Sequence, residues 1–176
     1  MTLDQLWAGW RQAYVVQASD AHRSGKGHTD TDDCVFCRII ATGAPSEDNG
    51  IVYRGDLACA MLNAYPYATG HLLVMPIRHV GDLPELTPQE SGAVWETART
   101  AVQVLTDAYV PDGANLGANL GRAAGAGIPS HLHLHVLPRW SGDTNFMTSI
   151  AGVRVMPESL TDTWVKVHAA WEKRAV

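Results

Sequence analysis

The sequence is poor in several kinds of residue, and each shortage narrows the class of protein. Basic residues are outnumbered, with 13 Lys and Arg against 18 Asp and Glu, which gives a formal net charge of -5. Nucleic-acid binding by phosphate neutralisation needs a basic surplus, so we expect no nucleic-acid partner, and an anionic ligand needs a local cradle. No stretch approaches the roughly 20 apolar residues of a membrane span, so we expect no membrane partner either.

Cysteine and targeting features are also scarce. The chain has three cysteines, two of them in the sequence CVFC at Cys34 and Cys37. This spacing suits a reducing compartment, where it indicates metal or redox chemistry more often than a structural disulfide. Residues 1–10 lack a basic region followed by an apolar one, as a secretory signal would have. These features predict a cytoplasmic protein.

The material that is present suffices for one ordinary domain. The chain has 176 residues, of which 46% are hydrophobic, enough for a core. Residues 1–16 carry leucine, tryptophan and tyrosine at helical spacing and predict an N-terminal helical extension. Residues 17–33 contain only alanine as an apolar residue and predict a flexible linker. We expect the main domain at 34–147 and a C-terminal extension with a helix at 148–176.

The main domain reads as mixed helix and strand. A short helix is expected at 34–41, capped by Asp32 or Asp33. Thr87 and Glu90 form a capping box ahead of a longer helix, whose apolar stripe is Val94, Trp95, Ala98, Ala101, Val102, Leu105 and Ala108. Strands are expected at 51–54, 57–63, 71–76, 114–120 and 132–137, and a last helix at 157–170. Short turns between strands indicate an α+β fold with an antiparallel sheet of about five strands and flanking helices.

The strongest local signal is the alternation of histidine with aliphatic residues in HLHLHVL, residues 131–137. Because strand side chains alternate faces, His131, His133 and His135 should share one face at intervals of about 6.6 Å. Leu132, Leu134 and Val136 should then face the core. A reactive histidine face and a metal bound by all three imidazoles are both open interpretations.

A loop rich in glycine and alanine, residues 113–130, precedes the histidines. Small residues let a ligand approach backbone N–H groups, and Arg122 adds positive charge, as a phosphate cradle requires. Turns are also built this way for purely structural reasons. The loop ends directly against His131, so anion donors and candidate nucleophiles would converge there.

These residues carry a family resemblance. HLHLHVL fits the histidine-triad pattern, and the chain resembles the histidine-triad (HIT) superfamily of nucleotide hydrolases and transferases over residues 34–147. Further matches are LNAYPYATGHLLVMPIRH, NLGRAAGAGI and PRWSGDTNFM. LWAGWRQAYV near the start and VMPESL near the end resemble a longer bacterial branch that includes diadenosine tetraphosphate phosphorylases.

The resemblance implies an enzyme in which His133 attacks the α-phosphorus of a nucleotide and forms a covalent nucleotidyl-histidine intermediate. It assigns stabilisation of the phosphoryl charge to His135, Asn119 and the loop residues Gly127, Ile128 and Ser130. Hydrolysis and phosphorolysis differ only in whether water or phosphate attacks second, and both stay open. A nucleotide-binding module with marginal turnover and a zinc-stabilised scaffold are the alternatives of another class.

The resemblance also implies a nucleoside subsite. Asn63 stands where a carboxylate often contacts the ribose hydroxyls, and an amide supplies one acceptor and one donor group instead. Val35, Phe36 and Ile39 match positions that line the base pocket, and apolar walls predict poor discrimination among bases. Simple core packing of a short helix is the alternative for each of these three residues.

Three interpretations compete for Cys34 and Cys37: a redox pair, reduced buried thiols, and zinc ligands. A redox pair would want a thioredoxin-like βαβ context, which the pattern lacks. The resemblance adds His79 and His131 as further ligands and so implies a closed, structural zinc site. Cys59, His71 and His168 receive structural roles.

The resemblance further implies a homodimer. The apolar helix face at 94–108 supports it, and Trp7 and Trp10 would add a contact.

Overall fold

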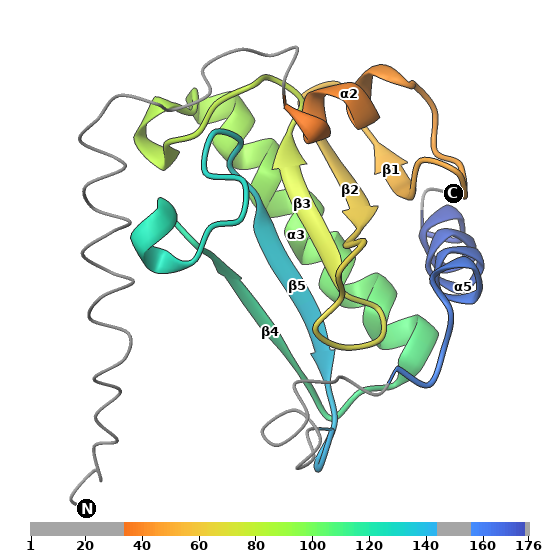
Figure 1. Ribbon diagram of the computed structural model, residues 1–176. Coiled ribbons are helices and arrows are strands. Elements are labelled where there is room, and N and C mark those ends of the chain that lie inside the picture. Colours follow the sequence, from red (N-terminus) through yellow and green to blue (C-terminus); the bar gives the residue numbers. More distant parts are fainter. Residues whose placement is uncertain (1–33, 144–155, 175–176) are drawn as a thin grey trace, which may run out of the picture.

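The computed structural model describes residues 34–143 and 156–174, and all structural statements refer to these residues. Five strands form one antiparallel sheet in the order β1-β2-β3-β5-β4 (Figure 1). The strands are β1 (Ile51–Arg54), β2 (Ala58–Leu62), β3 (Leu72–Pro76), β4 (Gly113–Ala118) and β5 (Leu134–Arg139). The helices are α2 (Val35–Ala41), α3 (Pro88–Tyr109) and α5 (Leu160–Glu172), with 3-10 turns at Leu83–Glu85 and Arg122–Ala124. The predicted α+β class is confirmed, whereas the N-terminal helix and linker predictions lie outside the described residues.

The sheet separates two apolar clusters. Against α3 and α5 pack Leu72, Val74, Leu134 and Val136, whose side chains are at most 3% exposed. Against α2, on the opposite face, pack Met61, Leu73 and Met75 together with Phe36. Every residue of β3 is buried, as expected for the middle strand of a sheet covered on both faces. Because Leu134 and Val136 face α3 and α5, the odd-numbered side chains of β5 lie on the opposite face, which α2 covers.

The capping predictions met different outcomes. Thr87 Oγ1 accepts from the Glu90 backbone N–H at 3.2 Å, and the Glu90 carboxylate accepts from the Thr87 N–H at 2.9 Å, which confirms the capping box of α3. The cap predicted for α2 is wrong, since Cys34 itself is the N-cap and makes no side-chain capping bond. The prediction that Trp95 belongs to the apolar stripe of α3 is wrong, because Trp95 is 52% exposed. The stripe runs 94, 98, 101, 105, and one residue turns the helix by about 100°, which carries Trp95 to the outer face.

Helix α5 covers the outer edge of β1. Trp164 Nε1–H donates to the Ile51 carbonyl at 2.8 Å, and His168 Nδ1–H donates to the Val52 carbonyl at 3.1 Å. The β1–β2 register shifts between Ile51 and Tyr53, which interrupts the regular ladder at this point. Side chains of the helix therefore satisfy edge carbonyls, and the structural role expected for His168 is confirmed.

Candidate active site and metal centre

The three histidines of the 131–137 segment lie on one face of the sheet, as predicted. Leu132 and Leu134 are 3% exposed and Val136 is fully buried on the core side. His131 and His133 are buried, and His135 is partly buried. Their ring nitrogens nevertheless turn to different partners, so binding of one metal by all three imidazoles is wrong. Each histidine ring has its own set of partners.

His133 is held in one tautomer. Its Nδ1 lies 2.8 Å from the His131 carbonyl oxygen, and because a carbonyl only accepts, Nδ1 carries the proton. The lone pair is then on Nε2. Burial lowers the pKa of His133 below its ordinary value, which favours the neutral ring at pH 7. Phe36 packs edge-on against the ring at 5.1 Å between centroids and restricts its rotation. The result is an oriented nucleophilic nitrogen.

His135 is oriented by His71, a residue whose role the sequence analysis missed. The Tyr67 backbone N–H donates to His71 Nδ1 at 3.0 Å, so the proton of this neutral imidazole is on Nε2. His71 Nε2–H donates in turn to His135 Nδ1 at 2.9 Å, which leaves the His135 proton on Nε2. His135 therefore presents an N–H donor beside His133, and the two ring centroids are 5.1 Å apart.

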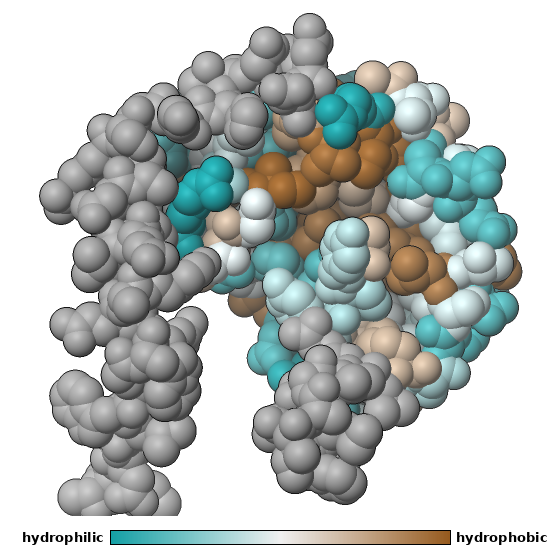
Figure 2. Space-filling view, in the orientation of Figure 1, coloured by the Kyte–Doolittle hydropathy of each residue, from teal (hydrophilic) through white to brown (hydrophobic). Residues whose placement is uncertain are grey.

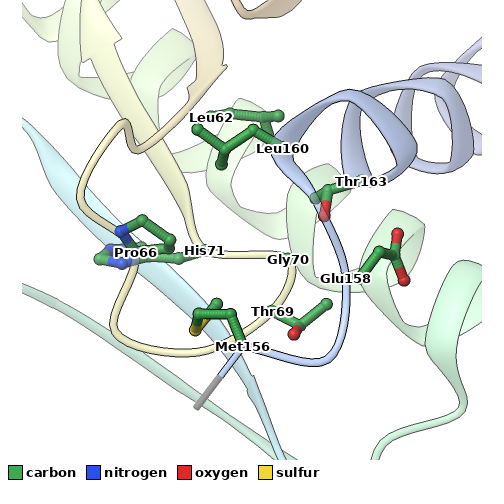
Figure 3. A pocket seen from close by; sticks show the side chains of 9 residues that line it. All are labelled: Leu62, Pro66, Thr69, Gly70, His71, Met156, Glu158, Leu160 and Thr163. Carbon is green, nitrogen blue, oxygen red and sulfur yellow. The ribbon is translucent and has the colours of Figure 1, made fainter. Parts of the chain in front are cut away.

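His71 is 1% exposed and lies at the edge of the site, directly before the first residue of β3. Behind it, a cavity of about 100 Å³ lies between the 63–70 loop and the start of α5, lined by Leu62, Pro66, Thr69, Gly70, Met156, Glu158, Leu160 and Thr163 (Figure 3). Thr69 Oγ1 is buried there without a partner among the described residues. A cavity of this size has room for ordered water, which commonly satisfies such a group.

The predicted nucleoside residues are only partly brought together. Phe36 lies against the histidines, Ile39 packs beside it, and Val35 is 36% exposed on the outside of α2. Asn63 lies next to His71, with its amide nitrogen 3.3 Å from His71 Nδ1. Its Oδ1 accepts from the Tyr65 N–H at 2.9 Å, so the loop already uses part of its acceptor capacity. Figure 2 shows a hydrophobic area where α2 covers this face.

The glycine-rich loop needs glycine at several positions to lie against the histidines. Gly121 and Gly125 adopt left-handed backbone conformations around the 3-10 turn, with φ of 74° and 95°. The Leu132 N–H donates to the Val80 carbonyl at 2.7 Å. A Cβ on Gly81 would stand 2.9 Å from the Pro129 carbonyl oxygen, so the loop end can lie this close only against glycine. Of the predicted loop residues, Ile128 packs against the α2 cluster, Ser130 is partly buried and Gly127 is exposed.

Four predicted metal ligands converge at the N-terminus of α2. The ligand atoms of Cys34, Cys37, His79 and His131 all lie within 4.8 Å of one another. Cys37 Sγ is 3.2 Å from His79 Nδ1, and both sulfur atoms are 3.5 Å from His131 Nδ1. Ligands of a tetrahedral zinc ion lie about 3.3 to 3.8 Å apart, given metal distances of about 2.0 to 2.3 Å. The residues fit zinc.

The chemistry of these groups also fits. His131 Nε2–H donates to the Pro76 carbonyl at 3.0 Å, which leaves Nδ1 to face the sulfur atoms. Burial lowers the pKa of His131 to about 4, so the ring is neutral, as a ligand must be. Burial, and then the neighbouring Cys34, raise the pKa of Cys37 to about 11, so a cation is needed to hold both sulfurs as thiolates. The cluster is compatible with a zinc site, and a site with four protein ligands would be structural.

The antiparallel sheet, the oriented histidine row and the adjoining Cys/His cluster define a histidine-triad protein. The model of the HIT domain matches residues 44–142, and the chain belongs to the HIT family.

Two relatives and one solved structure illustrate the similarity. The chain is 37% identical to AP-4-A phosphorylase of Mycobacterium tuberculosis (strain ATCC 25618 / H37Rv) over 98% of this chain and 86% of the relative. It is 36% identical to an asymmetrical bis(5'-nucleosyl)-tetraphosphatase of Schizosaccharomyces pombe over 53% of this chain and 50% of that protein. A Zn-bound histidine triad family protein from Mycobacterium smegmatis superposes with a TM-score of 0.67 at 27% identity, covering 83% of this chain and 98% of that one.

Proposed function

We propose that the protein cleaves or exchanges a phosphate bond at the α-phosphate of a nucleotide through a covalent intermediate on His133. The main support for this proposal is that hydrogen bonds fix the tautomers of two histidines on one face. His133 Nε2 has a lone pair, and His135 Nε2 beside it carries an N–H donor. Nucleophilic catalysis needs the first, and stabilisation of charge on phosphoryl oxygens needs the second.

In the first step, the His133 Nε2 lone pair forms an N–P bond, and the bond from phosphorus to the leaving oxygen breaks with its electron pair. His135 Nε2–H donates to an oxygen that gains charge, and Asn119 with the Gly127, Ile128 and Ser130 loop supplies further donors. In the second step, water or phosphate attacks phosphorus and the N–P bond breaks. Zinc when bound ties Cys34, Cys37 and His79 to His131, whose carbonyl orients the nucleophile.

Phosphate as the second nucleophile is the specific candidate. The near full-length similarity to a protein named AP-4-A phosphorylase supports it. Diadenosine tetraphosphate and phosphate would then give ADP and ATP, whereas hydrolysis would give AMP and ATP. The similarity to a bis(5'-nucleosyl)-tetraphosphatase supports the same substrate class with water as the acceptor. In both reactions we assign the base to Val35, Phe36 and Ile39, and the ribose to Asn63.

The test incubates the zinc-loaded protein with dinucleoside polyphosphates and nucleotide phosphoramidates, with and without phosphate, and identifies the products. ADP that appears only with phosphate supports phosphorolysis, and AMP supports hydrolysis. His133→Ala should abolish turnover and the covalent intermediate without changing the melting temperature by more than a few degrees. A His133→Ala variant with near-normal rates would overturn the mechanism, and binding without turnover by the wild type would favour a nucleotide-binding module.

We also propose a homodimer, formed through a surface other than the apolar face of α3. The apolar stripe of α3 is used by the chain's own core, because Val94, Ala98, Ala101 and Leu105 are at most 1% exposed. The edge strand β4, in contrast, is exposed at every residue, and Leu116 is 42% exposed. An unpaired edge is a template for a second strand, and a second copy would supply one. A stable monomer at micromolar concentration by sedimentation would contradict the dimer.

The remaining partner and location proposals rest on composition. Within residues 34–143 and 156–174, the helices are too short or too polar to cross a bilayer. A net charge of -5 supports the proposal that neither nucleic acid nor a membrane surface is a partner. The spacing of Cys34 and Cys37 supports the proposal that the protein works in the cytoplasm.

A further inference from the structure

Strands β4 and β5 together place two parallel rows of same-face residues beside His133, the proposed nucleophile. In the β4–β5 pair, Gly117 is opposite His135 and Asn115 is opposite Leu137. Directly opposed residues of antiparallel strands lie on the same face, so Asn115 and Gly117 share the face of the reactive histidines. Same-face neighbours along a strand are about 7 Å apart. Asn115 therefore lies one same-face step beyond His135, on the side away from His133.

Arg139 holds the side chain of Asn115 in place. Arg139 Nη1–H donates to Asn115 Oδ1 at 2.6 Å, and its Nε and Nη2 groups donate to the two oxygens of Asp143 at 2.5 and 2.7 Å. Because the amide oxygen is taken by Arg139, the orientation of the amide is fixed and its two N–H donors are turned away from the guanidinium. No described residue accepts from them.

The path between His135 and Asn115 is open. A Cβ on Gly117 would meet nothing within 4 Å, so the strand has no side chain and no close neighbour there. Asn63 directly follows β2, and Phe36 on α2 packs in a cluster with side chains of β2 and β3, the strands on the other side of β5 from β4. A leaving group that departs from the α-phosphate away from the nucleoside therefore faces β4.

We propose that Asn115, oriented by Arg139, is a specificity residue that binds the leaving polyphosphate and makes the enzyme favour long phosphate chains. This inference rests on the proposed function. Amide N–H groups are neutral donors to phosphate oxygens, and the Arg139 guanidinium behind the amide adds a positive charge that its pairing with Asp143 reduces. A substrate with one phosphate ends before this point, whereas the chain of a dinucleoside tetraphosphate extends past His135 toward Asn115.

The experiment uses Asn115→Asp, which keeps the shape but replaces the N–H donors with a carboxylate oxygen. The full-length zinc protein is assayed with diadenosine tri-, tetra- and pentaphosphate and with adenosine 5'-phosphoramidate, which has a single phosphate. We expect kcat/KM for the tetraphosphate, relative to the phosphoramidate, to fall about tenfold, the effect of about 1.4 kcal/mol. Inorganic tripolyphosphate as a competitive inhibitor of phosphoramidate cleavage should weaken by a similar factor.

Gln89→Glu is the matched control, since it makes the same change of charge at an exposed position at the start of α3. It should leave the substrate ratio and the tripolyphosphate inhibition unchanged. Asn115→Ala, which removes the donors without adding charge, should show a smaller change in the same direction. Equal ratios in wild type and Asn115→Asp would overturn the inference alone, as would a wild type that cleaves only the phosphoramidate. A wild type that cleaves no substrate would instead overturn the proposed function.

Discussion

Gly81 offers a sharp test of how the loop before the histidines is positioned. A methyl group at this position would stand 2.9 Å from the Pro129 carbonyl oxygen and 3.3 Å from Ser130 Cα. Both neighbours are backbone atoms, which cannot rotate away as a side chain does. The Gly81→Ala variant must therefore displace residues 129–130 or the loop that carries position 81 by several tenths of an ångström. Ser130 directly precedes His131 of the Cys/His cluster, so this displacement reaches the candidate active site.

The magnitude follows from the overlap. Overpacking of this kind costs about 1 to 3 kcal/mol. For a chain of this length each kcal/mol lowers the melting temperature by about 2 to 4 °C, so we expect a decrease of about 2 to 12 °C. Misplacement of catalytic groups by a fraction of an ångström should lower kcat about tenfold, since a shift of about 1 Å can cost about a hundredfold.

The assay compares thermal unfolding and steady-state kinetics of Gly81→Ala with those of Gly92→Ala. A Cβ on Gly92, within α3, would meet nothing within 4 Å, so Gly92→Ala should stabilise the helix by about 0.5 to 1 kcal/mol and leave kcat unchanged. Wild-type stability and kcat in Gly81→Ala would refute the reasoning. A loss of stability with normal kcat would show that the strain is absorbed away from the histidines.

Three further perturbations have defined outcomes. Elemental analysis should find about one zinc ion per chain in the wild type and none in Cys34→Ser/Cys37→Ser, which should also lose several kcal/mol of stability. A metal-free wild type with the melting temperature of the variant would contradict the site. Glu90→Gln should cost about 1 to 3 kcal/mol at pH 7, because the carboxylate accepts two hydrogen bonds from Arg78. The pKa of Glu90 is lowered to about 2, mainly by Arg78, so this stabilisation is complete above pH 4.5 and is lost as the pH falls toward 2; parallel acid unfolding curves of the two proteins would contradict it. Trp164→Phe should lower the melting temperature by about 2 to 6 °C by leaving the Ile51 carbonyl without its donor, and an unchanged value would show that another group replaces the indole.

Local patterns were sufficient for most of the elements. Alternation in HLHLHVL predicted which side chains of β5 face the core, because a strand has a strict period of two. The capping box predicted the start of α3, since Thr87 and Glu90 interact within one turn. The convergence of the four candidate zinc ligands was predictable because a family pattern joined Cys34 and Cys37 to two distant histidines.

Contacts that depend on strand order were not available from the sequence. His71 reaches His135 because β3 pairs with β5, with Leu73 opposite His135. His71 is two residues before Leu73 and so lies on the same face, diagonally from His135. Nothing in the 63 residues between the two histidines indicates that pairing. The misplacement of Trp95 has a different origin: an apolar residue next to a buried stripe looks like part of it until the helix is seen to turn.

The attachment of α5 to β1 also limits how copies of this chain can associate. Growth of a sheet by strand addition needs free backbone groups at an edge, and the indole and imidazole of α5 occupy carbonyls at the β1 edge. Among the described strands, β4 is then the edge left for pairing. A protein with two free sheet edges can form a continuous fibre, because each added copy exposes a new edge. A protein with one free edge forms a closed dimer, because pairing of two copies uses the free edge of both.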